Sequence, residues 1–351
     1  MDSGTGLPGT EGERVIPLRI GIVGYGYTGK IHAQACLAQA GARLIAIADS
    51  DPERLKDLPA GIRACRSYEE LLGNDVDAVN ICLPTHLHCQ AALAALSSGK
   101  HVLVEKPIAV NLEEAQCMLR AANAAGLVLY VGMTHRFYPE LQEAKKIVDS
   151  GAIGSIVFCN DCALEHLGFL SVPPWYMEKK FAGGGPALTS GIHLVDRLRW
   201  FTGDEVRVVT GSAANPYFGA DVEDAGQMFL RFRSGISAQV TVAFMREAHP
   251  LVCDLQVIGT RGSLTVHTWR GYEMWNASGH QEKVFYTGQE HRTKVQAGIE
   301  GEIREFCSSI AEGRDPWPSA QENLRSLRII LAYYEAARTG RSVELENADA
   351  L

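Results

Sequence analysis

The sequence lacks the features that point to membranes or nucleic acids. Its longest apolar runs are about the length of a strand, too short to span a bilayer. Its 33 lysines and arginines are outnumbered by 41 aspartates and glutamates, and the formal charge is −8. This balance gives no electrostatic reason to bind nucleic acid or anionic lipid. We therefore expect neither as a partner.

Paired cysteines and metal-ligand spacing are also missing. The nine cysteines are scattered and odd in number, and those inside apolar patterns, such as Cys82, Cys89 and Cys117, suit small buried hydrophobes. A reducing, cytoplasmic location fits this usage. His86 and His88 have no companion ligands at metal-site spacing, so no metal is predicted. Residues 1–16 have no apolar core of a signal peptide and are predicted to be a disordered tail.

Two domains fit into the 351 residues. Residues 17–136 alternate short apolar strands with helices, which predicts a doubly wound α/β domain with a parallel sheet covered on both faces. Residues 137–351 carry many strands separated by turn signals, which predicts a largely antiparallel sheet with helices. The expected strands are 18–23, 43–48, 78–83, 101–104, 127–131, 155–163, 206–211, 227–232, 236–244, 251–258 and 263–267, and the expected helices include 28–40, 87–97, 139–149, 186–201, 300–311 and 321–339.

A glycine-rich turn follows the first predicted strand and opens a helix. In this turn, Gly24 would make the tight bend, Gly26 would let the backbone approach a pyrophosphate, and Gly29 would let helix pack on strand. The helix N-terminus would meet the phosphate charge with free N–H groups. The cofactor-binding candidates here are Gly24, Tyr25, Gly26, Tyr27, Thr28 and Gly29.

Asp49 ends the second strand, 20 residues after Gly29, which is the spacing of a ribose-binding acid. A carboxylate there accepts the ribose hydroxyls and repels a 2′-phosphate. Arg54 is the nearest basic residue that follows. NAD is therefore favoured over NADP. The alternative for Asp49 is a turn former before Asp51 and Pro52.

Lys106 stands between Glu105 and Pro107 at the carboxyl end of a strand, where doubly wound sheets place their ligands. The proline restricts the conformation of the lysine. An amine held there could orient a hydroxyl substrate and stabilise charge on its oxygen. The alternative is an ordinary surface lysine on a loop. With the glycine turn, this position indicates a nicotinamide-dependent oxidoreductase.

The stretch 183–196 begins with three glycines and a proline suited to a first helical position. On one continuous helix, Thr189, His193 and Asp196 would share a face. His193 titrates near neutrality and is a candidate general acid–base. Asp196 is either an aid that orients the imidazole or a buried structural anchor.

These residues resemble the glucose–fructose oxidoreductase/inositol dehydrogenase (Gfo/Idh/MocA) family over nearly the whole length of the chain. The resemblance implies a Rossmann domain followed by a substrate-binding and oligomerisation domain with an open, mostly antiparallel sheet. We leave open whether the last helix packs back on the Rossmann domain. The matching segments are 24–29, 84–88, 105–107, 135–137, 183–196, 232–235 and 258–262.

The resemblance also implies an activity and site residues. Family members transfer a hydride between a nicotinamide and a ring hydroxyl or ketone of a sugar, cyclitol or related ring, as homodimers or homotetramers. Lys106 matches the active-site lysine and His193 the acid–base histidine, whereas Thr189 stands where many members have Asp. The further candidates are Leu83, Pro84, Thr85, His88, Glu105 and Lys106 for the cofactor, and Lys106, His135, Trp175 and His193 for the substrate.

Two other functions stay open at this point. Some relatives cleave glycosidic bonds through transient oxidation with retained NAD, and others sense dinucleotides without catalysis. Release of free sugar without net NADH would favour the hydrolase. The presence of both Lys106 and His193 argues against a sensor.

Overall fold

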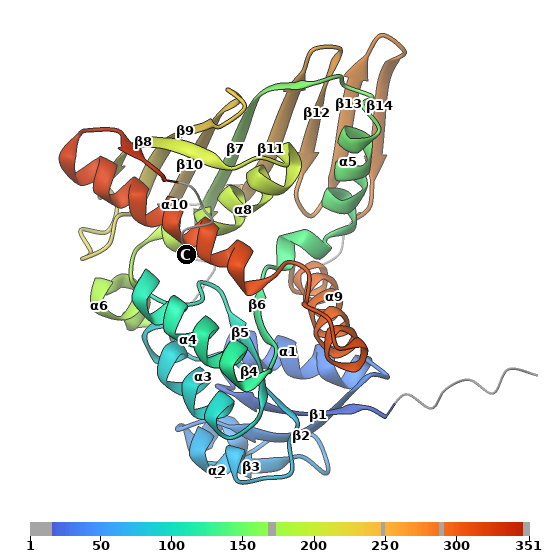
Figure 1. The fold of residues 1–351 in the computed structure, drawn as a ribbon, viewed down its shortest axis with the longest axis vertical. Coiled ribbons are helices and arrows are strands. Elements are labelled where there is room, and N and C mark those ends of the chain that lie inside the picture. The colour runs from blue at the N-terminus through green and yellow to red at the C-terminus, as the bar shows by residue number, and fades with distance from the viewer. Residues whose placement is uncertain (1–15, 168–172, 247–249, 288–290, 347–351) are drawn as a thin grey trace, which may run out of the picture.

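The computed structural model describes residues 16–167, 173–246, 250–287 and 291–346. The predicted tail over 1–16 lies outside these ranges except for its last residue. Figure 1 shows two layered bodies joined along several helices. Among the described residues, no helix is both long and apolar enough to cross a bilayer.

The first body is a six-stranded parallel sheet in the order β3-β2-β1-β4-β5-β6. This is the Rossmann order, with its reversal between β1 and β4. The central strands are buried along their length because helices cover both faces. Its elements are β1 (Leu18–Val23), α1 (Tyr27–Ala38), β2 (Ala42–Ala48), β3 (Arg63–Cys65), α2 (Tyr68–Leu72), β4 (Ala78–Ile81), α3 (His88–Ser97), β5 (His101–Glu105), α4 (Leu112–Ala125) and β6 (Leu129–Gly132).

The second body is a nine-stranded sheet in the order β14-β13-β12-β11-β7-β10-β9-β8-β15. Only β7 and β10 run parallel; the other neighbours are antiparallel. Its strands are β7 (Ile156–His166), β8 (Val206–Ala214), β9 (Ala225–Phe232), β10 (Ser237–Met245), β11 (Val252–Gly259), β12 (Gly262–His267), β13 (Gly271–Asn276), β14 (Gly279–Val284) and β15 (Val343–Glu344).

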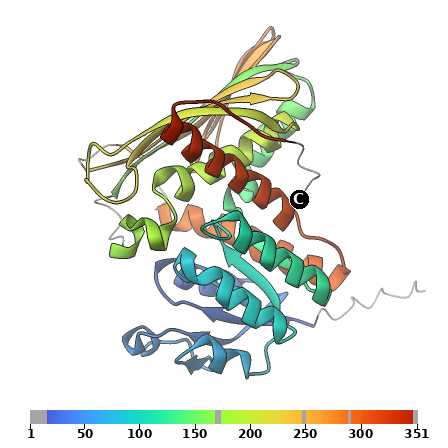
Figure 2. The same cartoon turned by 60° about the vertical axis from the view of Figure 1, so that its left-hand side comes forward.

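Helices cover one face of this second sheet, as Figure 2 shows. They are α5 (Pro139–Asp149), α7 (Pro186–Thr189), α8 (Gly191–Thr202) and α10 (Ala320–Thr339), with the short α6 (Lys179–Ala182) beside them. The alternating burial of β9 shows that its other face points to solvent.

Two long helices connect the bodies. α9 (His291–Glu312) follows β14 of the second sheet but packs against α1 of the Rossmann body. α10 packs on β8 and α8 and also touches α4 and β6. The carboxyl edge of the parallel strands therefore faces α7 and α8, with both long helices holding that arrangement.

The helix expected over 186–201 is broken, so the prediction of one continuous face is wrong. α7 ends at Thr189 and α8 starts at Gly191. The amide of His193 donates to the carbonyl of Ser190 (3.1 Å) and not to that of Thr189. The carbonyl of Thr189 instead accepts the ammonium of Lys106 (2.7 Å). A hydrogen bond from the Rossmann body thus takes the place of one backbone hydrogen bond of a continuous helix.

Candidate active site

The glycine turn leaves no room for a side chain at Gly24 or at Gly29. Gly24 has φ 91°, and a Cβ there would lie 2.6 Å from the carbonyl oxygen of Cys82. A Cβ on Gly29 would lie 1.9 Å from the carbonyl oxygen of Gly24. At Gly26 the nearest atom is the Nη1 of Arg54, at 3.7 Å, so this side of the turn is open. Helix and strand meet closely while the backbone stays accessible.

The start of α1 suits an anion. Its N-cap is Gly26, which offers no side-chain cap, and its first turn holds no acidic residue. The free N–H groups and the helix dipole therefore remain available to a pyrophosphate. Tyr25 is buried beside this turn, Tyr27 is exposed and Thr28 is half-buried. These features fit a dinucleotide.

Asp49 is already engaged by the protein. Its Oδ2 accepts the amide of Tyr25 (2.7 Å), and its Oδ1 accepts the amide of Asp51 (2.9 Å). The guanidinium of Arg54 lies 3.2 Å from Oδ2. The carboxylate thus ties the glycine turn to the end of β2. This position of Asp49 is compatible with both predicted roles, a ribose-binding acid and a turn former.

His88 braces the loop that follows β4. One ring nitrogen lies 2.8 Å from the carbonyl of Leu83, and the other lies 3.0 Å from that of Pro107. The loop carrying Pro84 and the buried Thr85 is therefore fixed to the segment after Lys106. The side chain of His88 supports the predicted cofactor loop, because both of its nitrogens face backbone carbonyls.

Lys106 joins the two bodies. It follows Glu105 at the end of β5, and its Nζ donates to the carbonyl of Thr189 at the end of α7. The hydroxyl of Thr189 donates to the carbonyl of Gly185 (3.0 Å), the N-cap residue of α7. The lysine therefore meets the backbone of Thr189. The hydroxyl of Thr189 is thus bonded to backbone at the start of its own helix, α7.

His193 stacks on His135. The ring centroids are 4.1 Å apart and the planes differ by 9°. The Nδ1 atoms of both rings are buried and receive no hydrogen bond from the described residues. Burial, then His135 and the charges of Lys106 and Arg197, hold the pKa of His193 well below its usual range. Burial, with Arg197 and Lys106, does the same for the pKa of His135. Both imidazoles are therefore neutral near pH 7.

Asp196 does not reach His193. Its carboxylate forms two hydrogen bonds with Arg136, at 2.7 and 2.9 Å, and both side chains are buried. Of the two alternatives predicted for Asp196, its position is that of a buried structural anchor. Its partner is Arg136, from the segment after β6. This buried pair fixes α8 to the carboxyl edge of the parallel sheet, and within the described ranges no carboxylate is bonded to His193.

Trp269 lies beside His135, and no sequence pattern predicted it at this site. It has φ 66°, a left-handed conformation that is unusual for a bulky residue. Its amide donates to the buried carboxyl of Glu140 (2.7 Å), and its ring lies edge-on to His135 at 6.1 Å. The available sequence signal for this contact was Glu140, a carboxyl residue on the buried face of an amphipathic helix. For Trp269 there was none, because a bulky aromatic residue is not expected in a left-handed conformation. Trp175 is half-buried against Tyr176.

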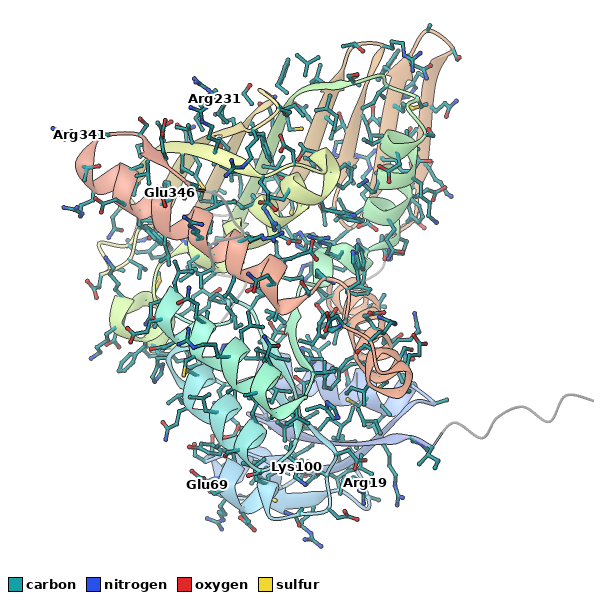
Figure 3. All side chains as sticks on the ribbon, in the orientation of Figure 1. Arg19, Glu69, Lys100, Arg231, Arg341 and Glu346 are labelled. Atoms are coloured by element: carbon teal, nitrogen blue, oxygen red, sulfur yellow. The ribbon has the colours of Figure 1, made fainter. Side chains whose placement is uncertain are left out.

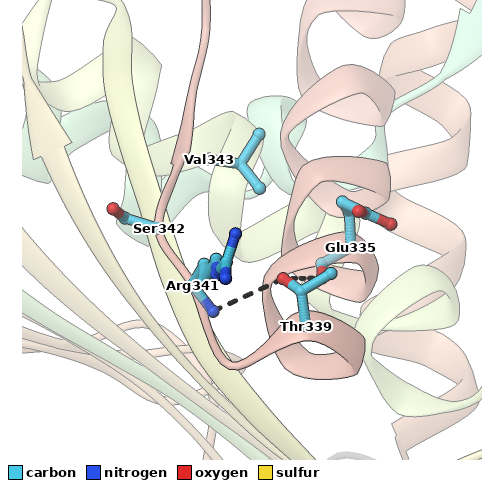
Figure 4. A pocket seen from close by; sticks show the side chains of 5 residues that line it. All are labelled: Glu335, Thr339, Arg341, Ser342 and Val343. Carbon is cyan, nitrogen blue, oxygen red and sulfur yellow. Dashed lines mark hydrogen bonds between the residues drawn. The ribbon is translucent and has the colours of Figure 1, made fainter.

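Other parts of the surface are distinct from this site. A cavity of about 450 Å³ is lined by the carboxyl end of α10 and the strand after it (Figure 4), and none of the predicted site residues lines it. Charged side chains labelled in Figure 3, such as Glu69 on one body and Arg231 on the other, lie at the outside of the molecule.

Comparisons with known proteins agree with this geometry. The family model described as "Oxidoreductase family, NAD-binding Rossmann fold" matches residues 18–133, and the "GFO/IDH/MocA C-terminal domain" matches residues 141–265. Inositol 2-dehydrogenase of Rhizobium meliloti is 27% identical over 93% of this chain and 99% of its own length. 1,5-Anhydro-D-fructose reductase of Ensifer adhaerens is 31% identical over 81% of this chain and 84% of its own.

Among solved structures, an oxidoreductase from Agrobacterium radiobacter in complex with NAD⁺, L-tartaric acid and magnesium superposes with a TM-score of 0.86. It is 22% identical, and the match covers 95% of this chain and 99% of that one, so it shows a shared fold. With the two family models and the curated relatives, the conclusion is that this chain belongs to the GFO/IDH/MocA family of oxidoreductases and begins with an NAD-binding Rossmann domain.

Proposed function

We propose that this protein oxidises a ring hydroxyl, or reduces the corresponding ketone, of a sugar, cyclitol or aminosugar derivative. The observation that carries the proposal is the bond between Lys106 of the Rossmann body and the backbone of Thr189, one turn before His193. It gathers an ammonium and a neutral imidazole at the carboxyl edge of the parallel strands, where this fold binds ligands. Relatives named for inositol and anhydrofructose support the substrate class.

NAD, held by the turn 24–29, supplies the hydride acceptor when bound. His193, neutral because it is buried, accepts a hydrogen bond and then the proton of the substrate hydroxyl. The ammonium of Lys106 stabilises negative charge on the same oxygen. In the reverse direction, the same groups polarise and protonate a ketone. His135 holds the ring of His193 by stacking and lines the substrate side with Trp269.

We also propose that the second sheet forms a homo-oligomer through its open face. Directly paired residues share a face, and the register runs from Trp275 through Ser263 and Ile258 to Phe158. Phe158, Phe229 and Trp275 are 40%, 47% and 56% exposed, which is high for large apolar side chains. Such a patch is typical of a subunit contact.

A reducing, cytoplasmic compartment is part of the same proposal. All nine cysteines are free thiols, and several lie in the core. Burial raises the pKa of thiols such as Cys89, to about 11, which keeps them unreactive.

The test is a screen of NAD-linked turnover with the purified protein across inositols, aldoses, anhydrosugars, aminosugars and their phosphates. Net NADH formation with a polyol, or NADH consumption with a keto-sugar, supports the proposal. Free sugar released from an aryl glycoside without net NADH would instead indicate the hydrolase. Clearly tighter binding of NADP than of NAD would contradict the role given to Asp49.

A further inference from the structure

A second buried polar cluster lies behind Lys106, and the proposed mechanism does not use it. His32 comes from α1, Asn80 from β4, Glu105 from β5 and Glu302 from α9. His32, Asn80 and Glu302 are fully buried, and the side chain of Glu105 is 12% exposed. One ligand-type atom from each of His32, Glu105 and Glu302 lies within 4.8 Å of the others. The cluster therefore holds either a cation or protons.

The hydrogen-bond directions favour protons. The thiol of Cys82 donates to Oδ1 of Asn80 (3.5 Å), so the amide nitrogen of Asn80 faces Nδ1 of His32, at 2.7 Å. An amide nitrogen only donates, so this Nδ1 accepts and the imidazole proton sits on Nε2. Nε2 then donates to Oε1 of Glu105 (2.7 Å). A nitrogen that carries a proton has no lone pair to offer a metal.

Glu105 is held as the ionised member of the cluster. Besides the bond from His32, its Oε2 accepts the backbone amide of Lys106 (3.1 Å). Burial alone would raise the pKa of Glu105, but the His32 hydrogen bond and nearby positive charges keep it below its usual range. Its position is therefore linked directly to the backbone of the lysine.

Glu302 is in the opposite situation. Neither of its oxygens accepts a well-formed hydrogen bond from a described residue. A Cβ placed on Gly132 would lie 3.4 Å from Oε1 of Glu105 and 3.5 Å from Oε2 of Glu302, so both carboxyl groups face the same point of β6. Burial and the carboxylate of Glu105 raise the pKa of Glu302 well above its usual range, against the influence of Thr134 and Lys106. Two buried carboxylates this close cannot both ionise.

We propose that Glu302 stays protonated beside the ionised Glu105, so that the pair carries a single negative charge behind Lys106. Glu302 is then a positioning residue, which fixes Glu105 and, through the amide of Lys106, the active-site lysine. The inference rests on the role proposed above for Lys106. In this arrangement, the protonated carboxyl group of Glu302 links α9 to the Rossmann body.

The pair has defined surroundings that bear on its titration. The groups that face it are His32 on α1, Cys82 after β4, His88 on α3, Lys106 after β5, Tyr130 on β6, Thr134 and Tyr138 in the segment after β6, and Tyr176 before α6. Burial raises the pKa values of Cys82, Tyr130 and Tyr138 well above their usual ranges, so these groups stay neutral while Glu302 titrates. Lys106 is the nearby cation.

Glu302→Gln provides a test that needs no substrate. Above the ordinary glutamate pKa of about 4.5, the unfolded chain releases this proton while the folded protein keeps it. The folded wild-type protein therefore loses stability as pH rises from that value towards the raised pKa. Glutamine has no proton to release. We expect Glu302→Gln to melt above wild type at neutral and mildly alkaline pH, with the difference vanishing near pH 4.5. A difference that does not change with pH, or a lower melting temperature throughout, overturns the proposal.

Infrared spectroscopy and a matched variant provide independent readouts. The wild-type minus Glu302→Gln spectrum at neutral pH should contain the carbonyl band of a protonated carboxylic acid, and its absence overturns the proposal. With a substrate found, turnover in Glu105→Gln should be about tenfold or more below that in Glu302→Gln, because loss of the Glu105 charge misplaces the lysine. Equal losses in both variants contradict the unequal charges. If no substrate turns over, the proposed function fails while the melting and infrared tests still decide this inference.

Discussion

At the scale of single residues, Lys106 is where the two bodies meet. Its ammonium reaches the backbone of Thr189, and the charge lies near both stacked histidines. We expect Lys106→Ala to lower kcat by roughly a thousandfold or more, because charge stabilisation and positioning are both lost. Steady-state kinetics with the substrate found in the screen measure the effect. NAD binding should persist. The exposed Lys146→Ala is the control, and a Lys106→Ala variant within tenfold of wild type would refute the role.

The histidine pair makes stability depend on pH. In the unfolded chain a histidine binds a proton near pH 6.5, but burial lowers the pKa of His193 and His135 in the folded protein. Below that value the unfolded state holds more protons, so stability falls as pH falls. We expect the free energy of unfolding to decrease from about pH 6.5 downwards, with a shallower slope in His193→Gln. Denaturant titrations at several pH values measure it, and equal slopes would show that the ring is not buried neutral.

A site residue could be predicted from the sequence when it belongs to a motif of residues that are close together in the chain. Lys106, His193 and the glycine turn carry local motifs, and the structure places them along one edge of the parallel sheet. The partner of Asp196, the stacking of His135 and the conformation of Trp269 arise only from tertiary contacts. Glu302 had a weak signal. It occupies a core-facing helical position between Ile299 and Phe306, where a carboxyl group is out of place unless it is protonated or paired.

At the scale of elements, apolar strands between helices were predicted within a few residues because their periodicity is local. β13 and β14 were missed, and β14 is exposed along its whole length, so it has no apolar alternation to detect. The short β3 and α2 were also missed. The break between α7 and α8 could not be predicted, because the carbonyl of Thr189 at the break bonds to Lys106, 83 residues earlier in the chain.

The glycine turn gives a prediction about an element. A Cβ on Gly29 would meet the carbonyl of Gly24 at 1.9 Å, so Gly29→Ala must push α1 away from β1. We expect NAD affinity to fall at least about tenfold, since the helix N-terminus no longer meets the pyrophosphate. Fluorescence titration of NADH measures this. Gly73→Ala is the matched control, because its φ is −71° and its new Cβ makes only an ordinary contact at 3.5 Å. Unchanged affinity in Gly29→Ala would contradict the assigned turn.

At the scale of the whole molecule, the chain crosses between its two bodies more than once. α9 follows β14 of the second sheet but packs on α1, and α10 lies against both bodies. Buried polar contacts follow the same route, with Arg136 bonded to Asp196 and Glu302 beside Glu105. The active-site edge is therefore fixed by elements from both ends of the sequence. A local pattern cannot reveal this arrangement.

The open face of the second sheet leads to the last prediction. Phe158 on β7 and Phe229 on β9 lie on the two strands that flank β10 and point away from the helices, in a patch shared with Trp275. We expect the wild-type protein to be a dimer or tetramer in light scattering, and Phe158→Glu/Phe229→Glu to fall towards the 38.2 kDa of one chain, because paired charges cannot be buried without partners. Leu37→Glu, which alters an equally exposed apolar residue on α1, should leave the assembly intact. A wild-type monomer, or dissociation by Leu37→Glu alone, would place the contact elsewhere.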